Sequence, residues 1–305
     1  MSDSSKNLRL INAMIAMCRI DNKWPHYLYD MGYGVKWIEY PFTCHTGDTV
    51  VPDLVITSDI QHNCILFESK SGKNIEDEQA KRYMKVQPDD VVYKLHVDTK
   101  GGKKPTIDVT YLCFTESAAN VVQQLNNLSA NFPVLEMSAN SIKLVSKTFS
   151  VRQLNQDFSQ GIAIERDKIP MGYFPFDEGS SNSEIAPYVV RKLVSFARQN
   201  KPHFSSEEIT REIVGSLWEQ FGPTKKRNLI NKVSSILGKA KVRELRGFLK
   251  KTEGYWTLSY DFPASKVFPT RRLEAISKKC RQFVARLRKE ERDEGHQLAL
   301  ILDID

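Results

Sequence analysis

The chain has 305 residues, of which 41% are hydrophobic and 27% are charged, and its net charge is +7 at pH 7. These values are typical of globular proteins, and the length suits two domains. No apolar run is long enough to cross a membrane, and the first residues lack the apolar core of a signal peptide. The five cysteines are scattered, which favours a reducing compartment. We therefore expect a cytoplasmic protein without membrane contact.

The first part of the chain predicts a helix followed by three strands. Residues 7–19 carry apolar side chains at helical spacing, and Val35–Phe42 reads as the first strand. Two further apolar runs, Val50–Thr57 and Cys64–Phe67, have strand length and are separated by a polar turn. We expect these two runs to pair as a hairpin.

Polar residues mark the ends of this hairpin. Asp53 lies near the start of its first strand, and Glu68 and Lys70 close the second. Because side chains alternate along a strand, Glu68 and Lys70 point the same way, and Asp53 can meet them from the neighbouring strand. Two carboxylates and water suit Mg²⁺ or Mn²⁺, and a lysine ammonium can hold a water or offset phosphate charge.

Pro52-Asp53 and Glu68-Ser69-Lys70 resemble the two halves of the PD-(D/E)xK nuclease motif. Gln79 and Tyr83, one helical turn apart, resemble the Q-x-x-x-Y element of RecB-type nucleases. The resemblance covers about the first 120 residues. It implies a restriction-endonuclease-like αβββαβ core with a mixed sheet flanked by helices. Single PD and ExK matches are common by chance, so their placement at paired strand ends is what gives them weight.

The resemblance also implies roles for particular residues. Asp53 and Glu68 would bind Mg²⁺ with the backbone carbonyl of Ser69, Lys70 would assist the attacking water, and Gln79 would orient the site. Members of this superfamily often carry a third acid. Its candidates here are Glu39 on the first strand and Asp21 just past the first helix, and neither matches cleanly. Beyond the motif, we expect a helix over Asn74–Val86 and strands over Asp90–Val97 and Ile107–Phe114.

The second half of the chain predicts a different domain. We assign residues 1–150 to the nuclease domain, 151–183 to a linker or arm, 184–262 to a winged-helix-like domain, and 263–305 to a basic helix and tail. In the third range, three helical patterns precede two strand-like pieces around Thr252-Glu253-Gly254. The expected fold class is thus an α/β domain followed by a mostly helical one.

Positive charge is concentrated in this second half. Between Thr224 and Lys251 there are ten lysine or arginine residues against one glutamate, a net charge of +9. Since the apolar positions of the helix face the core, the cations are left for the phosphates and grooves of a nucleic acid. A solvated basic face is the alternative. The candidate DNA-binding residues are Lys225, Lys226, Arg227, Lys232, Lys239, Lys241, Arg243 and Arg246.

The remaining expectations concern partners and alternatives. The tail, LALILDI, suits an added strand or a docking segment for a partner protein such as a transposase, an ATPase or a methyltransferase, and a homodimer stays open. The architecture resembles TnsA-like transposon endonucleases and equally suits restriction or phage defence. The alternatives are an RNA nuclease and a non-catalytic DNA-binding or assembly protein that keeps the fold. A zinc site built from Cys44, His45, His62 and Cys64 is disfavoured by poor chelate spacing.

Overall fold

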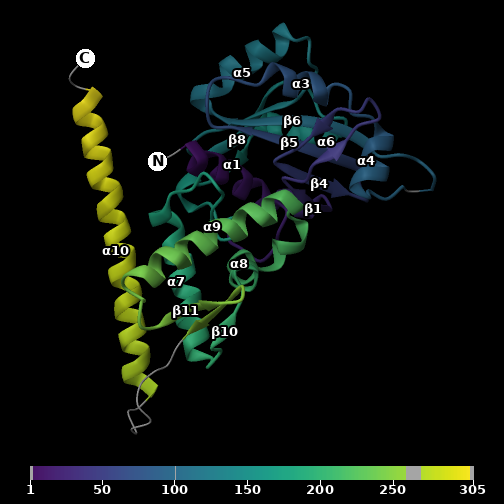
Figure 1. Cartoon of the computed structure of the whole chain (residues 1–305). Helices are drawn as coiled ribbons and strands as arrows, with labels where there is room; N and C mark the ends of the chain where they lie inside the picture. Colours follow the sequence, from purple (N-terminus) through teal and green to yellow (C-terminus); the bar gives the residue numbers. More distant parts are fainter. Residues whose placement is uncertain (1–2, 100, 259–268, 303–305) are drawn as a thin grey trace. The chain divides into compact units, whose positions relative to one another are not determined.

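The computed structural model describes residues 3–99, 101–258 and 269–302. The chain divides into two compact units (Figure 1). The first unit comprises Met1–Phe174 and Ser216–Lys226, and the second comprises Pro175–Gly215 and Arg227–Asp305. The first unit therefore continues past residue 150, where we expected it to end. It also takes in a short segment of the second half of the chain.

The first unit alternates helices and strands. Its helices are α1 (Asp3–Met17), α2 (Tyr27–Asp30), α3 (Asp77–Tyr83), α4 (Pro88–Leu95), α5 (Thr115–Asn127), α6 (Arg152–Gln160) and the 3-10 turn η1 (Arg166–Lys168). Its strands are β1 (Tyr33–Ile38), β2 (Phe42–Thr43), β3 (Thr49–Val50), β4 (Leu54–Ser58), β5 (Asn63–Lys70), β6 (Thr106–Phe114), β7 (Val134–Met137), β8 (Ser141–Ser146) and β9 (Ile162–Ala163).

Seven of these strands form one mixed sheet in the order β1-β4-β5-β6-β7-β8-β9. Strands β1, β4 and β5 are antiparallel neighbours, β5, β6 and β7 are parallel, and β8 and β9 return antiparallel. The parallel neighbours are joined through helices, as parallel pairing requires. Because β5 is central, all its residues except Lys70 are buried. The expected α/β fold with a mixed sheet is confirmed.

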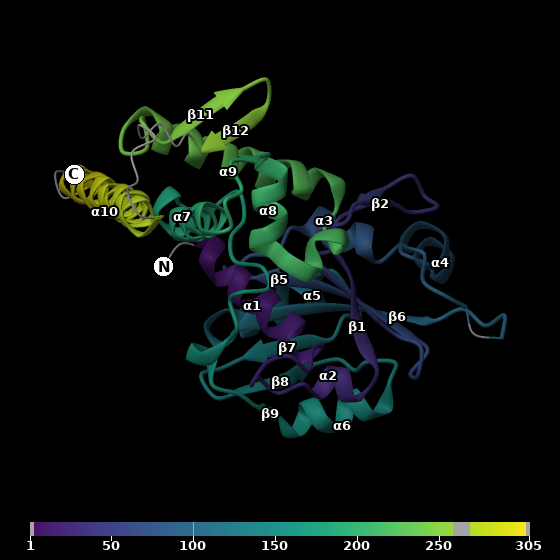
Figure 2. The same cartoon turned by 90° about the horizontal axis from the view of Figure 1, so that it is seen from below.

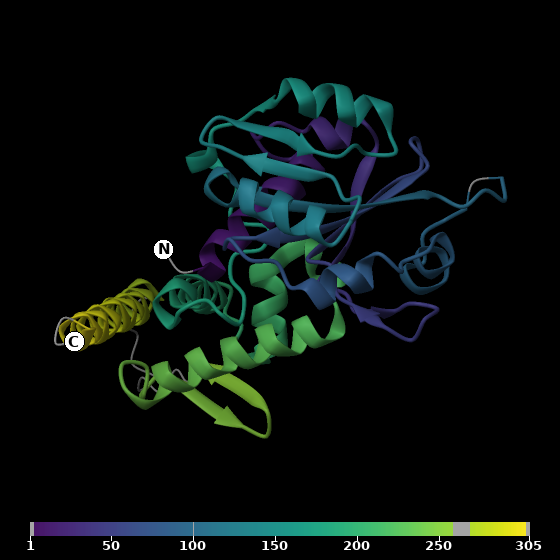
Figure 3. The same ribbon diagram turned by 90° about the horizontal axis from the view of Figure 1, so that it is seen from above.

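Helices cover both faces of this sheet. Helices α3 and α5 lie on one face and α1 on the other, and the views from above and below agree (Figure 3, Figure 2). One core lies under α3, α4 and α5 and joins apolar residues of the sheet, such as Val55 and Leu66, to Ala80, Val91 and Val121. Burial of these side chains on folding stabilises the unit by about 1.5–3 kcal/mol for each large one.

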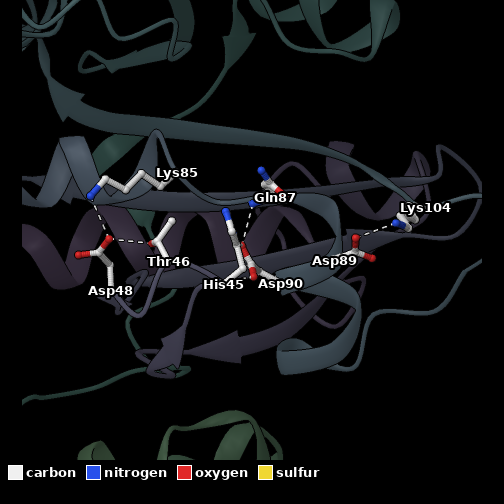
Figure 4. Close-up of polar contacts among 8 residues, drawn as sticks. All are labelled: His45, Thr46, Asp48, Lys85, Gln87, Asp89, Asp90 and Lys104. Atoms are coloured by element: carbon white, nitrogen blue, oxygen red, sulfur yellow. Dashed lines mark hydrogen bonds and ion pairs between the residues drawn. The ribbon is translucent and has the colours of Figure 1, made fainter.

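The predicted strand over Asp90–Val97 is wrong, because this stretch forms helix α4 (Figure 4). Pro88 occupies its first turn, where a missing N–H costs no hydrogen bond. The Asp90 carboxylate accepts from the backbone N–H of Gln87 at 2.9 Å and of His45 at 2.8 Å. The start of the helix is thus satisfied by Asp90, whose side chain also contacts the His45 ring. The capping interactions of Asp90 favour a helix here, although the apolar residues that follow resemble a strand.

The second unit is largely helical. Its elements are α7 (Asn182–Arg198), β10 (His203–Phe204), α8 (Ser206–Val214), α9 (Pro223–Val242), β11 (Leu249–Thr252), β12 (Tyr255–Leu258) and α10 (Pro269–Leu302). Residues 216–220 of the 3-10 turn η2 (Gly215–Gln220) and the first residues of α9 lie in the stretch that belongs to the first unit. The small sheet has the order β10-β12-β11. Helices α7 and α10 lie side by side (Figure 2).

Two expectations for the C-terminal stretch meet different outcomes. The predicted helix over Arg271–Arg292 is present within the longer α10. The tail is helical through Leu302, so a strand over LALILDI is wrong there, and residues 303–305 lie outside the described part. Within the residues that the structure describes, no helix is both long and apolar enough to cross a membrane.

Candidate active site

Two neighbouring strands place Asp53 and Glu68 together. Leu54 of β4 pairs with Phe67 of β5 in the antiparallel ladder. Asp53 directly precedes this pair and Glu68 directly follows it, so the two acids lie at the same end of adjacent strands. The apolar, β-branched character of both strands is what fixes this register, since a slip by one residue would turn Glu68 to the opposite face.

Asp53 is held by the residue that follows Glu68. Its Oδ2 accepts a hydrogen bond from the Ser69 backbone N–H at 2.7 Å and another from the Ser69 hydroxyl. Within the described residues, Oδ1 of Asp53 has no hydrogen-bond partner. Burial of the carboxyl raises its pKa, and the two Ser69 hydrogen bonds oppose the rise. Asp53 is therefore fixed in orientation with one oxygen left for a ligand.

Glu68 is more deeply buried, with 4% of its surface exposed. Its Oε2 accepts from the Tyr83 hydroxyl at 2.9 Å, and its Oε1 lies 3.0 Å from the Lys70 ammonium. Burial, and then the charge of Asp53, raise the pKa of Glu68 to about 8. Because the charge of Asp53 disfavours the ionised form of Glu68, a further cation beside the two carboxylates would be stabilising.

Helix α3 presents the next two residues. Gln79 and Tyr83 lie one turn apart and both reach β5, as their spacing predicted. The Lys70 ammonium donates to Gln79 Oε1 at 3.2 Å while it pairs with Glu68. Lys70 is thus held between a carboxylate and an amide, with 13% of its side chain exposed. The structure brings Asp53, Glu68, Ser69, Lys70 and Gln79 to one place.

One residue of this place was not predicted. Tyr111 of β6 is paired with Glu68 in the parallel ladder. It is fully buried, and its hydroxyl has no hydrogen-bond partner within the described residues. Burial raises the pKa of Tyr111, and the charges of Glu68 and Asp53 add to this. In the sequence it is one aromatic residue within an apolar strand, which gave no signal.

The two candidates for a third acid lie apart from each other. Glu39 directly follows β1, and its backbone N–H donates to the Asp53 carbonyl at 3.1 Å. Its carboxylate is 2.7 Å from the ammonium of Lys225. Asp21 instead pairs with Arg19 at 2.8 Å and accepts from the Tyr173 hydroxyl at 2.6 Å. Only Glu39 is in contact with the residues around Asp53.

The donor set fits a small divalent cation. Asp53 offers an open carboxylate oxygen, Glu68 adds a second carboxylate, and the strand next to Glu68 carries the buried Tyr111, whose hydroxyl has no partner among the described residues. Mg²⁺ is commonly bound through one or two carboxylates and retains several waters. The described residues contain no group of three or more His, Cys, Asp or Glu side chains suited to hold a metal. The ligands that this place could offer a metal are two carboxylates, from Asp53 and Glu68, and the backbone carbonyl of Ser69.

The candidate DNA-binding residues do not form one set. Lys225 is 4% exposed and paired with Glu39, so it is not on the surface where a phosphate would bind. Lys226 lies in the first unit with it, 3.4 Å from Glu219. Lys232 donates to the Glu178 carbonyl, and Arg243 pairs with Glu290. The exposed cations of this set are Arg227, Lys239, Arg243 and Arg246, with Lys241 half-buried.

The cysteine and histidine pairs considered for zinc have other surroundings. Cys44 and Cys64 are buried thiols, and burial raises the pKa of each. His45 contacts Asp90 rather than a cysteine. These residues pack as part of the first unit.

Comparison with known proteins gives a family for the first unit. The profile of the MJECL32 domain matches residues 6–174, more than half of the chain, and the chain belongs to this family. A curated relative, the uncharacterized protein MJECL32 of Methanocaldococcus jannaschii, is 26% identical over 173 residues. The match covers 50% of this chain and 37% of the relative. No solved structure matches the chain.

Proposed function

We propose that the chain is a metal-dependent nuclease of the PD-(D/E)xK type that hydrolyses phosphodiester bonds in DNA. The observation that carries this proposal is the convergence at one end of β4 and β5. There Asp53 and Glu68 lie on the same side of the Leu54–Phe67 ladder pair, and Lys70 bridges Glu68 and Gln79. An ordinary surface Glu-Lys pair would have neither the burial nor the second carboxylate. Both features indicate a site and not a solvated ion pair.

The order of elements in the first unit supports the same reading. Helix α1, strands β1, β4 and β5, helix α3 and strand β6 follow one another in the αβββαβ order of the restriction-endonuclease-like core. Helix α4, the β2-β3 pair and the strands after β6 are additions to this order. In this interpretation, the candidate site lies on the paired strands of the core. That is the place which the PD and ExK motifs occupy in the family that the sequence resembles.

Each residue has a defined task in this proposal. Asp53, Glu68 and the Ser69 carbonyl would hold Mg²⁺ or Mn²⁺, which when bound polarises the phosphodiester and neutralises developing charge. The Lys70 ammonium holds the attacking water or offsets phosphate charge. Gln79 fixes the Lys70 side chain, and Tyr83 fixes one oxygen of Glu68. The Ser69 N–H and hydroxyl fix Asp53.

The second unit supports DNA as the substrate. Its elements α7, β10, α8, α9, β11 and β12 follow the order of a winged helix, in which the first short strand joins the wing hairpin. Here β10 pairs with β12, and β12 pairs with β11. Of the five apolar residues expected on the buried face of α9, Leu229, Val233, Ile236 and Leu237 are buried and Ile230 is half-buried. Exposed cations on and after α9 are then available to phosphates.

The proposed activity suits three biological settings. End cleavage of a transposon, restriction and phage defence all need a metal-dependent DNA endonuclease. A transposase, an ATPase or a methyltransferase would be the matching partner protein. Helix α10, with its buried stripe of Ile276, Cys280, Phe283 and Leu287, docks within the second unit, and its outer face remains the candidate partner surface.

A cleavage assay tests the proposal. The full chain is incubated with duplex DNA, single-stranded DNA and RNA of the same sequence, in Mg²⁺ and in EDTA. We expect Mg²⁺-dependent cleavage of DNA and no product in EDTA. Cleavage of RNA alone would favour the RNA nuclease. Binding to DNA without cleavage in Mg²⁺ or Mn²⁺ would favour a non-catalytic DNA-binding protein.

A further inference from the structure

A short segment from the second half of the chain is built into the first unit. The Gly222 N–H donates to the Ile38 carbonyl at 2.9 Å, and Phe221 forms a parallel β-bridge with Ile38. A Cβ atom on Gly222 would lie 2.2 Å from the Glu39 carbonyl oxygen, so only glycine permits this close approach. These backbone contacts hold the segment 216–226 against the end of β1.

This segment delivers Lys225 to the turn after β1. The Lys225 ammonium lies 2.7 Å from Glu39 Oε1 and 5.2 Å from the centre of the Phe174 ring. Phe174 is itself held by Asn12, which exchanges two hydrogen bonds with its backbone. A buried ammonium is strongly unfavourable unless it is paired, and the Glu39 carboxylate, whose side chain is 22% exposed, supplies such a partner.

The turn that Lys225 holds is in contact with the candidate active site. Glu39 has a left-handed backbone with φ of 45°, an uncommon conformation for a residue with a side chain. From this conformation its N–H reaches the Asp53 carbonyl at 3.1 Å. The positive charge of Lys225 also favours the ionised form of Asp53. A chain of direct contacts thus runs from Lys225 through Glu39 to Asp53.

We infer that Lys225 is a positioning residue of the candidate active site: by pairing with Glu39 it fixes the backbone of Asp53. The segment that carries it lies outside residues 6–174, the stretch that matches the MJECL32 domain. The site therefore depends on a part of the chain beyond the family domain. The metal-affinity consequence rests on the proposed function, whereas the effect on the backbone of Asp53 does not.

The first test compares Lys225→Met with Lys168→Met in the full chain. Lys168 also pairs with an acid of the first unit, Glu165, but both side chains are more than 60% exposed. Hydrogen exchange of the Glu39 amide and calorimetric Mg²⁺ binding are measured without any substrate. For Lys225→Met we expect exchange about tenfold faster at Glu39 and Mg²⁺ affinity lower by about 10–100-fold. Lys168→Met should leave both quantities unchanged.

A second pair of variants displaces the segment without touching a charged group. Gly222→Ala forces the backbone of residues 221–223 away from Glu39, whereas Gly238→Ala adds a Cβ in open space within α9, the helix that begins just after Gly222. Gly222→Ala should reproduce the faster exchange and the weaker Mg²⁺ binding, and Gly238→Ala should not. If Lys225→Met fails to fold, Gly222→Ala and its control Gly238→Ala still test whether the segment positions Asp53.

The outcomes separate the inference from the proposed function. Unchanged Glu39 exchange and Mg²⁺ affinity within twofold of wild type, in Lys225→Met or in Gly222→Ala, would overturn the inference even if the melting temperature falls. If the wild-type chain binds no Mg²⁺ and cleaves no nucleic acid, the proposed function fails. The amide exchange of Glu39 then still decides whether Lys225 positions Asp53.

Discussion

The hydroxyl of Tyr83 donates a hydrogen bond to Glu68 Oε2 at 2.9 Å, and this contact ties helix α3 to strand β5 at the candidate active site. Burial is the main reason that the pKa of Glu68 is raised, and the hydrogen bond from Tyr83 opposes the rise. The contact therefore helps Glu68 to ionise, which any metal-binding role requires.

From this contact we predict the behaviour of Tyr83→Phe. Loss of the hydroxyl should raise the pKa of Glu68 further, so the pH at which Mg²⁺ binding is half complete should move upward. The variant should also lose about 1–2 kcal/mol of stability, since a buried acceptor loses a partner. Calorimetric Mg²⁺ titrations between pH 6 and pH 9 measure the shift. A pH profile identical to that of wild type would mean that Tyr83 does not influence Glu68.

The raised pKa of Glu68 predicts a pH-dependent stability. Because its pKa in the folded chain, about 8, exceeds the ordinary value, the protonated form is favoured by folding. This contribution is present below the ordinary pKa and is lost as pH rises through about 8. In EDTA, Glu68→Gln should therefore gain stability relative to wild type between pH 5 and pH 9, by roughly 1–3 kcal/mol.

Urea unfolding at several pH values measures this difference, and added Mg²⁺ supplies the control. Because the cation binds the ionised carboxylate of wild type, Mg²⁺ should stabilise wild type and not Glu68→Gln at pH 8. A stability difference that stays constant with pH would show that Glu68 titrates normally in the folded chain.

Lys70 should affect chemistry more than metal binding. Lys70→Ala removes the ammonium that contacts Glu68 and Gln79, so cleavage should fall by at least about 100-fold. Mg²⁺ binding should persist or strengthen, because the competing cation at Glu68 is gone. Lys70→Arg should restore little activity, since a planar fork replaces a compact charge. Complete loss of Mg²⁺ binding in Lys70→Ala would contradict the assigned role.

DNA binding should depend on the exposed cations of the second unit. Replacing Arg227, Lys239 and Arg246 with glutamate should weaken binding of all sequences alike. It should also reduce the log–log salt slope by about 0.9 for each phosphate that the variant no longer neutralises. Fluorescence anisotropy at several salt concentrations measures the slope in the full chain. Lys168→Glu, a reversal at an exposed position of the first unit, is the matched control. An unchanged salt slope in the triple variant would show that these cations face solvent and do not bind the phosphates of DNA.

The sequence predicted those features that local pattern determines. The β-branched runs around Ile56 and Ile65 predicted the paired strands β4 and β5, and the four-residue spacing of Gln79 and Tyr83 predicted their common helix face. The stretch after Pro88 was misassigned because its apolar run resembles a strand, whereas Asp90 caps a helix there. There the hydrogen bonds of Asp90 at the helix start decided the structure, and the strand-like apolar pattern did not.

The contacts at the site that the sequence did not reveal have a different cause. Lys225 was grouped with the DNA-binding cations because ten basic residues stand together in the sequence, and nothing local shows which of them meets an acid nearly 190 positions away. Tyr111 was not noticed because its importance arises only from its pairing with Glu68 across the sheet. Long-range partners of this kind follow from tertiary packing and are visible only in the folded chain.

The central claim is that Asp53 and Glu68 together bind the divalent cation that cleavage requires. The most direct measurement titrates Mg²⁺ by calorimetry into wild type, Asp53→Asn and the control Asp89→Asn, and assays the same samples for DNA cleavage. Asp89 pairs with the exposed Lys104 and lies outside the site. The account predicts that Asp53→Asn remains folded but loses both Mg²⁺ binding and cleavage, while Asp89→Asn retains both. Mg²⁺-dependent cleavage by Asp53→Asn at the wild-type rate would contradict it.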